Sequence, residues 1–376
     1  MEIKELSEIK LFEMFAGYGG GSFALKKANI PFELVGYSEI DKFAIKCFEQ
    51  NHKGNNYGDC KLINPNDLPD FNLLTGGFPC QDVSIAGNRN LSKGRTNLYK
   101  EIIRIAEVKK PKYMLLENVK GLLSMGKERK LVNIIVSDLQ RIGYGVCWKV
   151  LNSKDYGIPQ NRERVWFVCK YGGWKFGEFS FPNKEELKLK LGDILEDNVD
   201  KKYYLTEKTI KMFLKHRVRQ IEKKNGFFFS PKTVDSISNS LTTKEGSRAT
   251  DNFILQNKYS ENRIFRISPT ITSTESKTTY LVHSLFPRTG NPKQGGTGHL
   301  YKDDGTSYCL DTGNCLTQLL DNFQFRRLTP KECFRLMGFL NDEIDLTGLS
   351  DNQLYKLVGN GWEINLVSKI FKEMFK

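Results

Sequence analysis

A cysteine that directly follows a proline is the first residue of this chain with the potential for chemistry. Cys80 comes at the end of the glycine-rich turn 75–80, which itself follows the short apolar run 71–74. Such a run is typical of a buried strand, so Cys80 is expected on a loop at the end of that strand, where open α/β sheets carry reactive groups. An accessible, stabilised thiolate is a nucleophile, whereas a core cysteine is only a small hydrophobic residue. Taken alone, the Pro79-Cys80 pair favours the structural interpretation.

A carboxylate is expected at the same edge of the sheet. The apolar segment 111–119 is typical of a strand and carries Glu117 near its end. An apolar environment raises the pKa of a glutamate, so Glu117 could donate a proton near neutral pH. The alternative is a surface acid that caps a helix or forms an ion pair, and it would be preferred if the cysteine turn were absent.

Two arginines lie at the start of a later strand. Arg162 and Arg164 are separated by one residue and lead into the apolar run 165–168, which is typical of a strand. Because side chains alternate along a strand, the two arginines are expected to face one side and Glu163 the other. Two arginines on one face can hold an anionic or carbonyl-rich ligand. In isolation, an exposed pair of ion-paired arginines is the more ordinary interpretation.

The N-terminal segment has the order of elements that binds a nucleotide-type cofactor. The sequence predicts a strand over 9–15, a glycine-rich turn over 16–22 and a helix over 23–28. Glycines in such a turn let the backbone approach a ligand closely. The order of elements therefore favours a fold that binds an adenosine-containing cofactor.

Two acidic residues follow at spacings that suit an adenosine. Glu39 comes after the apolar run 32–38, about 20 residues after Gly19, where a carboxylate can accept hydrogen bonds from ribose hydroxyls. Asp59 could receive the adenine amino group, or it could be an ordinary turn aspartate. Because Ser22 stands where the last glycine of the dinucleotide pattern would fall, a pyrophosphate-bearing dinucleotide is disfavoured.

The segment after the cysteine is polar and basic. Residues 82–96 contain two glycines and the cations Arg89, Lys93 and Arg95. Next to a candidate nucleophile, such a stretch suits a lid that closes over the substrate and contacts phosphates. A solvated surface loop is the competing interpretation.

Composition and charge limit the class of protein. The chain has 376 residues, enough for two domains, and shows neither an 18-residue apolar run nor a signal peptide, so a cytoplasmic protein is expected. Eight scattered cysteines without a CxxC pair suggest neither a zinc site nor a disulfide framework. Of the net charge of +13, residues 201–266 contribute +9, from 15 Lys/Arg and 6 Asp/Glu. A basic excess confined to one region is typical of nucleic-acid binding.

The remaining pattern places elements around these residues. Helices are predicted over 97–109, 129–142, 206–224 and from Tyr355 to Phe375, and a strand over 145–151. Thr329 is the expected N-cap of a further helix, with Pro330 as its first residue and Gly338 at its end. Between a linker near 191–195 and about residue 325, the sequence is rich in Ser, Thr, Asn and Gly and indicates loops on a small irregular scaffold.

Taken together, these motifs resemble those of the cytosine-5 DNA methyltransferases of bacterial restriction-modification systems. The match covers about residues 8–170 and 325–376, and the order and distance of Pro-Cys-Gln and Glu-Asn-Val are its strongest signal. The matching motifs are Phe15-Ala16-Gly17-Tyr18-Gly19-Gly20, Gly77-Phe78-Pro79-Cys80-Gln81, Glu117-Asn118-Val119, Gln160-Asn161-Arg162-Glu163-Arg164, Arg327-Leu328-Thr329-Pro330 and Gly359-Asn360.

The resemblance implies an α/β fold. Its larger part would be a Rossmann-like S-adenosylmethionine-dependent methyltransferase domain with a mixed, mostly parallel sheet, formed by residues 1–190 and 341–376. Residues 191–340 would form a smaller, irregular, β-containing target-recognition domain, including a hinge motif at 326–340.

The resemblance also assigns roles. Cys80 would add covalently to C6 of a flipped-out cytosine, Glu117 would hydrogen-bond N3 and the amino group, Arg164 would contact O2, and Arg162 would support the site or a phosphate. Cofactor residues would be Phe15, Ala16, Gly17, Gly19, Gly20, Glu39, Ile40, Asp59, Cys60, Pro79, Leu98 and Asn360, and DNA contacts Gln81, Ser84, Arg89, Lys93 and Arg95. Departures from the common pattern are the triple glycine 19–21 and Gly361-Trp362, where a small residue and an aliphatic are usual.

The implied reaction transfers a methyl group from S-adenosylmethionine to double-stranded DNA, leaves S-adenosylhomocysteine and needs no metal. The enzyme would act as a monomer that protects host DNA, with a cognate restriction endonuclease as a partner in function rather than in a complex. A transfer-RNA type of cytosine-5 methyltransferase is the main alternative, although the 150 residues from 191 to 340 favour DNA. A non-catalytic homologue and a dehydrogenase explain fewer of these residues.

Overall fold

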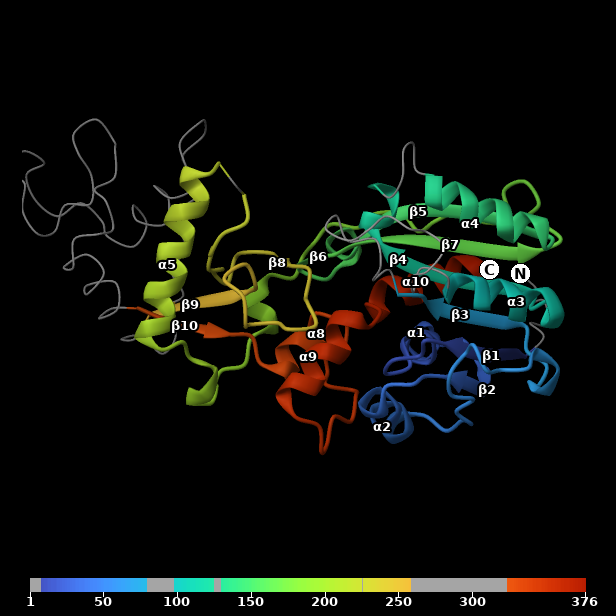
Figure 1. The fold of residues 1–376 in the computed structure, drawn as a ribbon, viewed down its shortest axis with the longest axis horizontal. Coiled ribbons are helices and arrows are strands. Elements are labelled where there is room, and N and C mark those ends of the chain that lie inside the picture. Colours follow the sequence, from blue (N-terminus) through green and yellow to red (C-terminus); the bar gives the residue numbers. More distant parts are fainter. Residues whose placement is uncertain (1–7, 80–97, 125–129, 225, 258–322) are drawn as a thin grey trace, which may run out of the picture. The chain divides into compact units, whose positions relative to one another are not determined.

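The computed structural model describes residues 8–79, 98–124, 130–224, 226–257 and 323–376 (Figure 1). The chain forms two compact units. The first comprises Met1–Leu189, Ile237–Glu245 and Thr329–Lys376, and the second comprises Lys190–Ser236 and Gly246–Leu328.

A six-stranded sheet forms the centre of the first unit. Its strands, in spatial order, are β2 (Phe32–Ser38), β1 (Ile9–Met14), β3 (Leu73–Gly77), β4 (Tyr113–Val119), β7 (Glu163–Tyr171) and β5 (Tyr144–Asn152). The first four are parallel, and β7 runs antiparallel to both β4 and β5. The predicted α/β fold with a mixed, mostly parallel sheet is thus confirmed.

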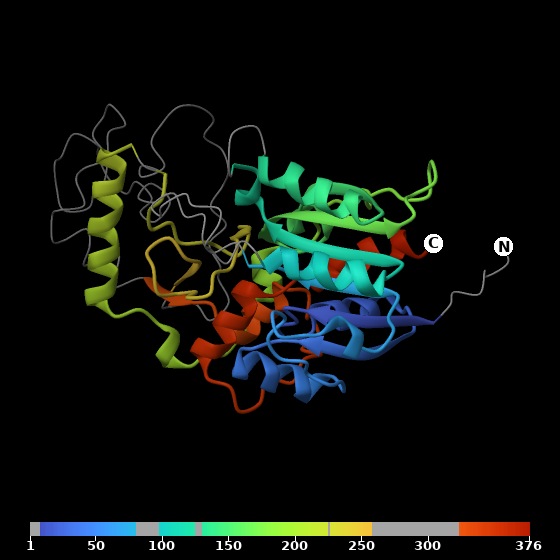
Figure 2. The ribbon, with the colours of Figure 1, turned by 45° about the vertical axis from the view of Figure 1, so that its right-hand side comes forward.

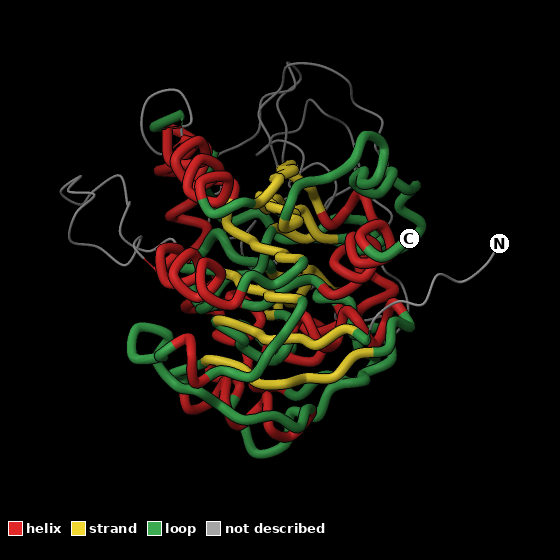
Figure 3. The backbone as a smooth tube through the Cα atoms, turned by 90° about the vertical axis from the view of Figure 1, so that its right-hand side faces the viewer, coloured by secondary structure: helices red, strands yellow, loops and turns green. Residues whose placement is uncertain are grey.

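Helices cover both faces of this sheet (Figures 2 and 3). The described helices of this unit are α1 (Gly20–Ala28), α2 (Lys42–Asn51), α3 (Leu98–Lys109), α4 (Lys130–Arg141), α8 (Pro330–Arg335), α9 (Asp351–Asn360) and α10 (Ile364–Met374), with short 3-10 helices at Pro65–Asp67, Lys120–Ser124 and Ser153–Tyr156. The apolar faces of α3 and α4 pack with β3, β4 and β7 in one core, and α1 packs against α10. Burial of these faces is the main source of stability, since apolar area removed from water drives folding.

The third strand is longer than its apolar run predicted. The sequence indicated a strand over 71–74, whereas β3 extends to Gly77 because Gly76 pairs with Met14 of β1 and Gly77 pairs with Glu117 of β4. Cross-strand pairing from both sides outweighs the weak strand propensity of the two glycines. As a result, the end of β3 lies directly beside Glu117.

The predicted C-terminal helix from Tyr355 to Phe375 is wrong, because α9 and α10 are separate helices. The α9 helix ends at Asn360, and the α10 helix is capped by Glu363, whose carboxylate accepts hydrogen bonds from the backbone N–H groups of Asn365 (2.6 Å) and Leu366 (3.1 Å). A carboxylate at this position satisfies N–H groups that the first turn leaves unpaired. The break places Trp362 between the two helices.

The α8 helix begins as predicted. Thr329 is its N-cap and Pro330 its first residue, and Thr329 and Glu332 form a reciprocal capping box. The helix ends at Arg335 rather than at Gly338, because Gly338 N–H donates to the Arg335 carbonyl across a tighter turn.

A buried glutamine explains where the two units divide. The Gln160 side chain, fully buried, donates to the Leu336 carbonyl (2.7 Å) and accepts from Leu241 N–H (3.2 Å). In addition, β6 (Gln160–Asn161) pairs with β8 (Ser238–Asn239). Residues 237–245 and 329–340 therefore belong to the first compact unit, although the sequence placed both segments in the second domain.

The second unit is small and packs on aromatic residues. The α5 helix (Glu207–Glu222), capped by Thr206, lies against the antiparallel pair β9 (Phe253–Asn257) and β10 (Phe323–Arg327). Its core contains Ile210, Phe213, Leu214, Phe229, Ala249, Phe253, Leu255 and Phe325. The unit also contains short 3-10 helices at Leu191–Ile194 and Lys201–Tyr203. The predicted basic amphipathic helix is present, shorter at each end than 206–224.

Candidate active site

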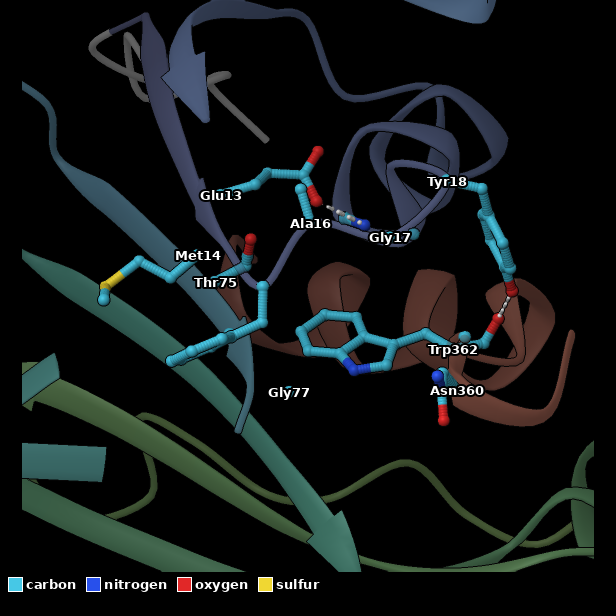
Figure 4. Close-up of a pocket in the computed structure, with 14 residues that line it drawn as sticks. Glu13, Met14, Ala16, Gly17, Tyr18, Thr75, Gly77, Asn360 and Trp362 are labelled. Atoms are coloured by element: carbon cyan, nitrogen blue, oxygen red, sulfur yellow. Dashed lines mark hydrogen bonds between the residues drawn. The ribbon is translucent and has the colours of Figure 1, made fainter. Parts of the chain in front are cut away.

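The turn between β1 and α1 has an unusual backbone. Phe15 adopts a left-handed conformation with φ 54°, followed by Gly17 at φ 57° and Gly19 at φ 88°. A bulky residue in this region is strained, and such strain persists mainly at functional sites. Phe15 lines a pocket together with the backbone of the glycine turn (Figure 4).

A buried carboxylate occupies the start of the α1 helix. Glu13 accepts hydrogen bonds from the backbone N–H groups of Gly21 (3.0 Å) and Ser22 (2.9 Å) and from the Ser22 hydroxyl. Burial raises the pKa of Glu13, against these hydrogen bonds, which lower it. The N–H groups that bind a pyrophosphate in dinucleotide folds are therefore already satisfied by the protein.

A second carboxylate is fixed beside the same turn. Glu39 accepts hydrogen bonds from the backbone N–H groups of Gly17 (2.9 Å), Ile40 (2.8 Å) and Asp41 (2.9 Å). A carboxylate can accept about four hydrogen bonds. Glu39 therefore retains capacity to accept from a ligand hydroxyl next to the glycine turn.

The pocket brings together five of the predicted cofactor residues. Its lining consists of Glu13, Met14, Phe15, Ala16, Gly17, Tyr18, Gly20, Gly21, Thr75, Gly76, Gly77, Asn360, Gly361 and Trp362. Of the predicted set it contains Phe15, Ala16, Gly17, Gly20 and Asn360. Sequence reasoning missed Glu13, Tyr18, Thr75 and Trp362. Of these, Trp362 comes from the distant turn between α9 and α10.

The other predicted cofactor residues lie outside this lining. Gly19 is the N-cap of α1, Cys60 is buried, and Pro79 and Leu98 are partly buried. Asp59 accepts a hydrogen bond from Lys61 N–H (3.0 Å), as in an ordinary aspartate turn. The Ile40 side chain is 72% exposed.

The predicted acid and one predicted arginine form a buried ion pair. Glu117 lies near the end of β4 and is 8% exposed, and the Arg164 Nε lies 2.8 Å from its Oε1. The Trp362 indole N–H also donates to the Glu117 carboxylate. Burial raises the pKa of Glu117, while Arg164, Arg162 and the Trp362 hydrogen bond oppose this shift. Burial and the neighbouring donors therefore act in opposite directions on the pKa of this carboxyl group.

The second arginine holds the turn that borders the pocket. Arg162 is 2% exposed, and its Nη2 donates to the carbonyls of Gly359 (3.2 Å) and Gly361 (2.7 Å). Burial, and secondly the charge of Arg164, lower the pKa of Arg162 to about 9. The two carbonyls flank Asn360, so this guanidinium fixes the backbone of the α9–α10 turn.

The described chain stops one residue before the candidate nucleophile. Cys80 and the predicted DNA contacts Gln81, Ser84, Arg89, Lys93 and Arg95 lie outside the described residues. The chain that leads to Cys80 is nevertheless held near the acid. The Asn118 Nδ2 donates to the Phe78 carbonyl (3.0 Å), and Gly77 pairs with Glu117. Asn118 belongs to the motif Glu117-Asn118-Val119, but the resemblance assigns it no role. The only sign of this contact in the sequence is that Asn118 is a polar residue close to the end of an apolar run.

The chain is similar to one protein family over nearly its whole length. A family model for the C-5 cytosine-specific DNA methylases matches residues 9–376. The chain belongs to this family. Because of this membership, the chain is a DNA cytosine-5 methyltransferase, and the resemblance carried by its motifs is confirmed. The family uses S-adenosylmethionine as its methyl donor.

Curated relatives match over nearly the whole chain. The type II methyltransferase M2.ScrFI of Lactococcus lactis subsp. cremoris is 30% identical, over 98% of this chain and 99% of its own. The orphan methyltransferase M.SPRI of Bacillus phage SPR is 29% identical, over 98% of each chain. The solved structure of the S. pombe Dnmt2 methyltransferase, at 18% identity, superposes with a TM-score of 0.67 over 98% of each chain, which shows the shared fold.

Two further observations concern the described residues only. Among them, no group of three or more His, Cys, Asp or Glu side chains is arranged to hold a metal ion. None of the helices described is both long and apolar enough to cross a membrane.

Proposed function

We propose that this methyltransferase acts on C5 of a cytosine turned out of double-stranded DNA, within a short specific sequence, through a covalent bond between Cys80 and C6. The observation that supports this most is the Glu117–Arg164 ion pair beside the end of β3. It brings a carboxyl group and a guanidinium to the strand end that leads to Cys80.

The residues suit the electronic demands of the reaction. C5 of cytosine is a weak nucleophile, and addition of the Cys80 thiolate forms the C6–S bond and converts the ring to an enamine that is nucleophilic at C5. Glu117, hydrogen-bonded to N3 and the amino group, and Arg164, at O2, disperse the charge that develops on the ring. Once C5 carries the methyl group, a base takes the C5 proton, the electrons of the C–H bond re-form the C5–C6 double bond, and the C6–S bond breaks to release the thiolate.

The cofactor is assigned to the glycine turn. When bound, S-adenosylmethionine supplies the methyl group and leaves S-adenosylhomocysteine. Phe15 would stack on the adenine, Glu39 would accept from the ribose hydroxyls, and Asn360 would lie on the methionine side. The carboxylate of Glu13 supports a cofactor without phosphate groups, because it already occupies the donors at the start of α1.

Duplex DNA is the proposed partner, and the second unit supplies positive charge for it. The exposed residues of α5 include Lys208, Lys211, Lys215 and Arg219. Lysine and arginine on one helix face suit a phosphate backbone. Gln81, Ser84, Arg89, Lys93 and Arg95 are proposed to contact the DNA when the 82–96 segment closes over the extruded base. In the cell, this would protect host DNA from an endonuclease of the same specificity.

The test compares two nucleic acids as substrates. Purified protein is incubated with S-adenosylmethionine labelled in its methyl group and either duplex DNA or transfer RNA, and incorporated label is counted. We expect label in DNA, loss of incorporation in Cys80→Ala, and wild-type incorporation in the matched variant Cys147→Ala, whose thiol is a partly buried free cysteine of β5. Label in transfer RNA alone, or an active Cys80→Ala variant, would overturn the proposal.

A further inference from the structure

Trp362 is held from several sides at the centre of the first unit. Its carbonyl accepts a hydrogen bond from the Tyr18 hydroxyl, and the carbonyl before it accepts from Arg162. The ring meets that of Trp166 edge to face, with centroids 5.1 Å apart and an interplanar angle of 75°. Only 8% of Trp362 is exposed. Its side chain therefore has one fixed orientation, directed into the pocket toward Gly77 (Figure 4).

The neighbouring glycines are matched to this indole. A Cβ atom added at Gly20 would lie 2.9 Å from the Trp362 Cβ, closer than real Cβ atoms approach such groups. A Cβ atom added at Gly77 would lie 2.8 Å from the Trp362 Nε1 and 3.2 Å from the Glu117 Oε2. The indole N–H and the acid thus converge on one point beside the end of β3, and Gly20 and Gly77 leave the room for them to do so.

The two oxygens of Glu117 are approached by different donors. Arg164 Nε lies 2.8 Å from Oε1, and Oε2 lies on the side of Gly77 and the indole. A carboxyl group held only by Arg164 could rotate, whereas a donor at each oxygen fixes its plane. The orientation of that plane decides whether the acid can meet N3 and the amino group of a cytosine.

We infer that Trp362 is a positioning residue for Glu117, and that its indole N–H fixes the carboxyl group in the orientation that meets the extruded cytosine. The inference rests on the proposed role of Glu117 in the reaction. It assigns a purpose to the aromatic residue that stands after Gly361 where an aliphatic side chain is usual.

The contact between Trp362 and Glu117 affects the pH dependence of methylation. Arg164, Arg162 and the Trp362 N–H all favour the ionised form of Glu117, and Tyr18 also interacts electrostatically with it. Loss of the N–H alone destabilises the carboxylate, so the pKa of Glu117 rises. If the protonated acid is the form that donates to N3, the alkaline limb of kcat/KM moves to higher pH.

The test uses two tryptophan-to-phenylalanine variants. Trp362→Phe keeps a ring but removes the N–H. Trp174→Phe is the matched control, because the Trp174 Nε1 is buried and donates no hydrogen bond, and its ring packs on Tyr113 and Phe179 rather than on Trp362. kcat/KM for duplex DNA is measured from pH 6 to 10 with saturating labelled cofactor. We expect the alkaline limb to move up by about one pH unit in Trp362→Phe, as for loss of one hydrogen bond to a charged group, and to stay in place in Trp174→Phe.

A third variant tests the same contact without altering either side chain. Gly77→Ala inserts a methyl group between the indole and the carboxyl group, so it should shift the limb as Trp362→Phe does, and it should add nothing in the Trp362→Phe background. Equal profiles in all variants, or equal shifts in Trp362→Phe and Trp174→Phe, would overturn the inference. Absence of methylation by the wild-type protein would instead overturn the proposed function.

Discussion

For the buried ion pair at the candidate active site, we predict that substitutions affect stability and activity differently. Glu117, Arg162 and Arg164 lie together with one negative and two positive charges and little contact with solvent. Glu117→Gln keeps the size of the side chain but leaves two positive charges without a counter-charge. Arg164→Met removes one positive charge and leaves Glu117 with Arg162. The double variant restores the original net charge.

The expected magnitudes follow from the cost of an unpaired buried charge. Removal of one partner of a buried pair costs about 3–5 kcal/mol, so Glu117→Gln should lower the free energy of unfolding by about 3 kcal/mol, since the amide keeps one acceptor. Arg164→Met should cost less, because the remaining carboxyl group can bind a proton. The double variant should be about 2 kcal/mol more stable than the sum of the single effects predicts.

The double variant should regain stability but not methylation activity. Loss of a group that stabilises charge in the transition state lowers the rate by roughly 10²–10³-fold, so Glu117→Gln and the double variant should both fall to about 1% of wild-type methylation or less. Urea unfolding followed by circular dichroism measures the first quantity, and methyl transfer from labelled cofactor at 25 °C, with every variant folded, measures the second. Additive stability effects, or more than about a tenth of wild-type activity in the double variant, would refute this reasoning.

Three further predictions concern other carboxyl and amide groups. Glu39→Ala should weaken S-adenosylmethionine binding by roughly 10–100-fold in calorimetry, as for loss of one charged hydrogen bond, and Glu33→Ala, on the β2 strand that precedes Glu39, should not; equal affinities would contradict the assignment of Glu39. Asn118→Leu leaves the Phe78 carbonyl without its buried donor, so the free energy of unfolding should fall by about 1–3 kcal/mol, and an unchanged value would contradict the contact. Burial raises the pKa of Glu363 to about 7, above its ordinary 4.5, so the unfolded chain loses this proton at lower pH than the folded protein does. Stability should therefore fall by about 3 kcal/mol as pH rises from about 4.5 to beyond 7, and a Glu363→Gln variant with the same slope would contradict this.

Several parts of the site were predictable from sequence because their signals are local. The apolar run before Glu117 fixes a strand and its end, and the spacing of Arg162 and Arg164 fixes which residues share a face. The glycine turn and Glu39 follow from one strand-turn-helix unit. The capping box at Thr329 was equally local, since its partners lie three residues apart.

Other features depend on contacts between distant segments, which no local pattern reveals. Trp362 reaches the pocket only because Glu363 caps α10 and breaks what looked like one helix. Gln160 forms hydrogen bonds with the segments near residues 241 and 336, so both segments belong to the first compact unit. Nothing in the amino-acid composition of these segments indicates this boundary. In the sequence, Glu13 is an ordinary residue of a predicted strand. Its carboxylate accepts hydrogen bonds from the first turn of α1 only because this helix packs beside the strand.

The central claim is that a thiolate at position 80 carries out methylation of cytosine in DNA. Bisulfite sequencing of DNA from cells that express the wild-type protein or Cys80→Ala tests it most directly, because the readout reports the modified base and its sequence context together. We expect protected cytosines within one short motif for the wild type and none for the variant. Protection that persists in Cys80→Ala, or its absence in both, would contradict the account.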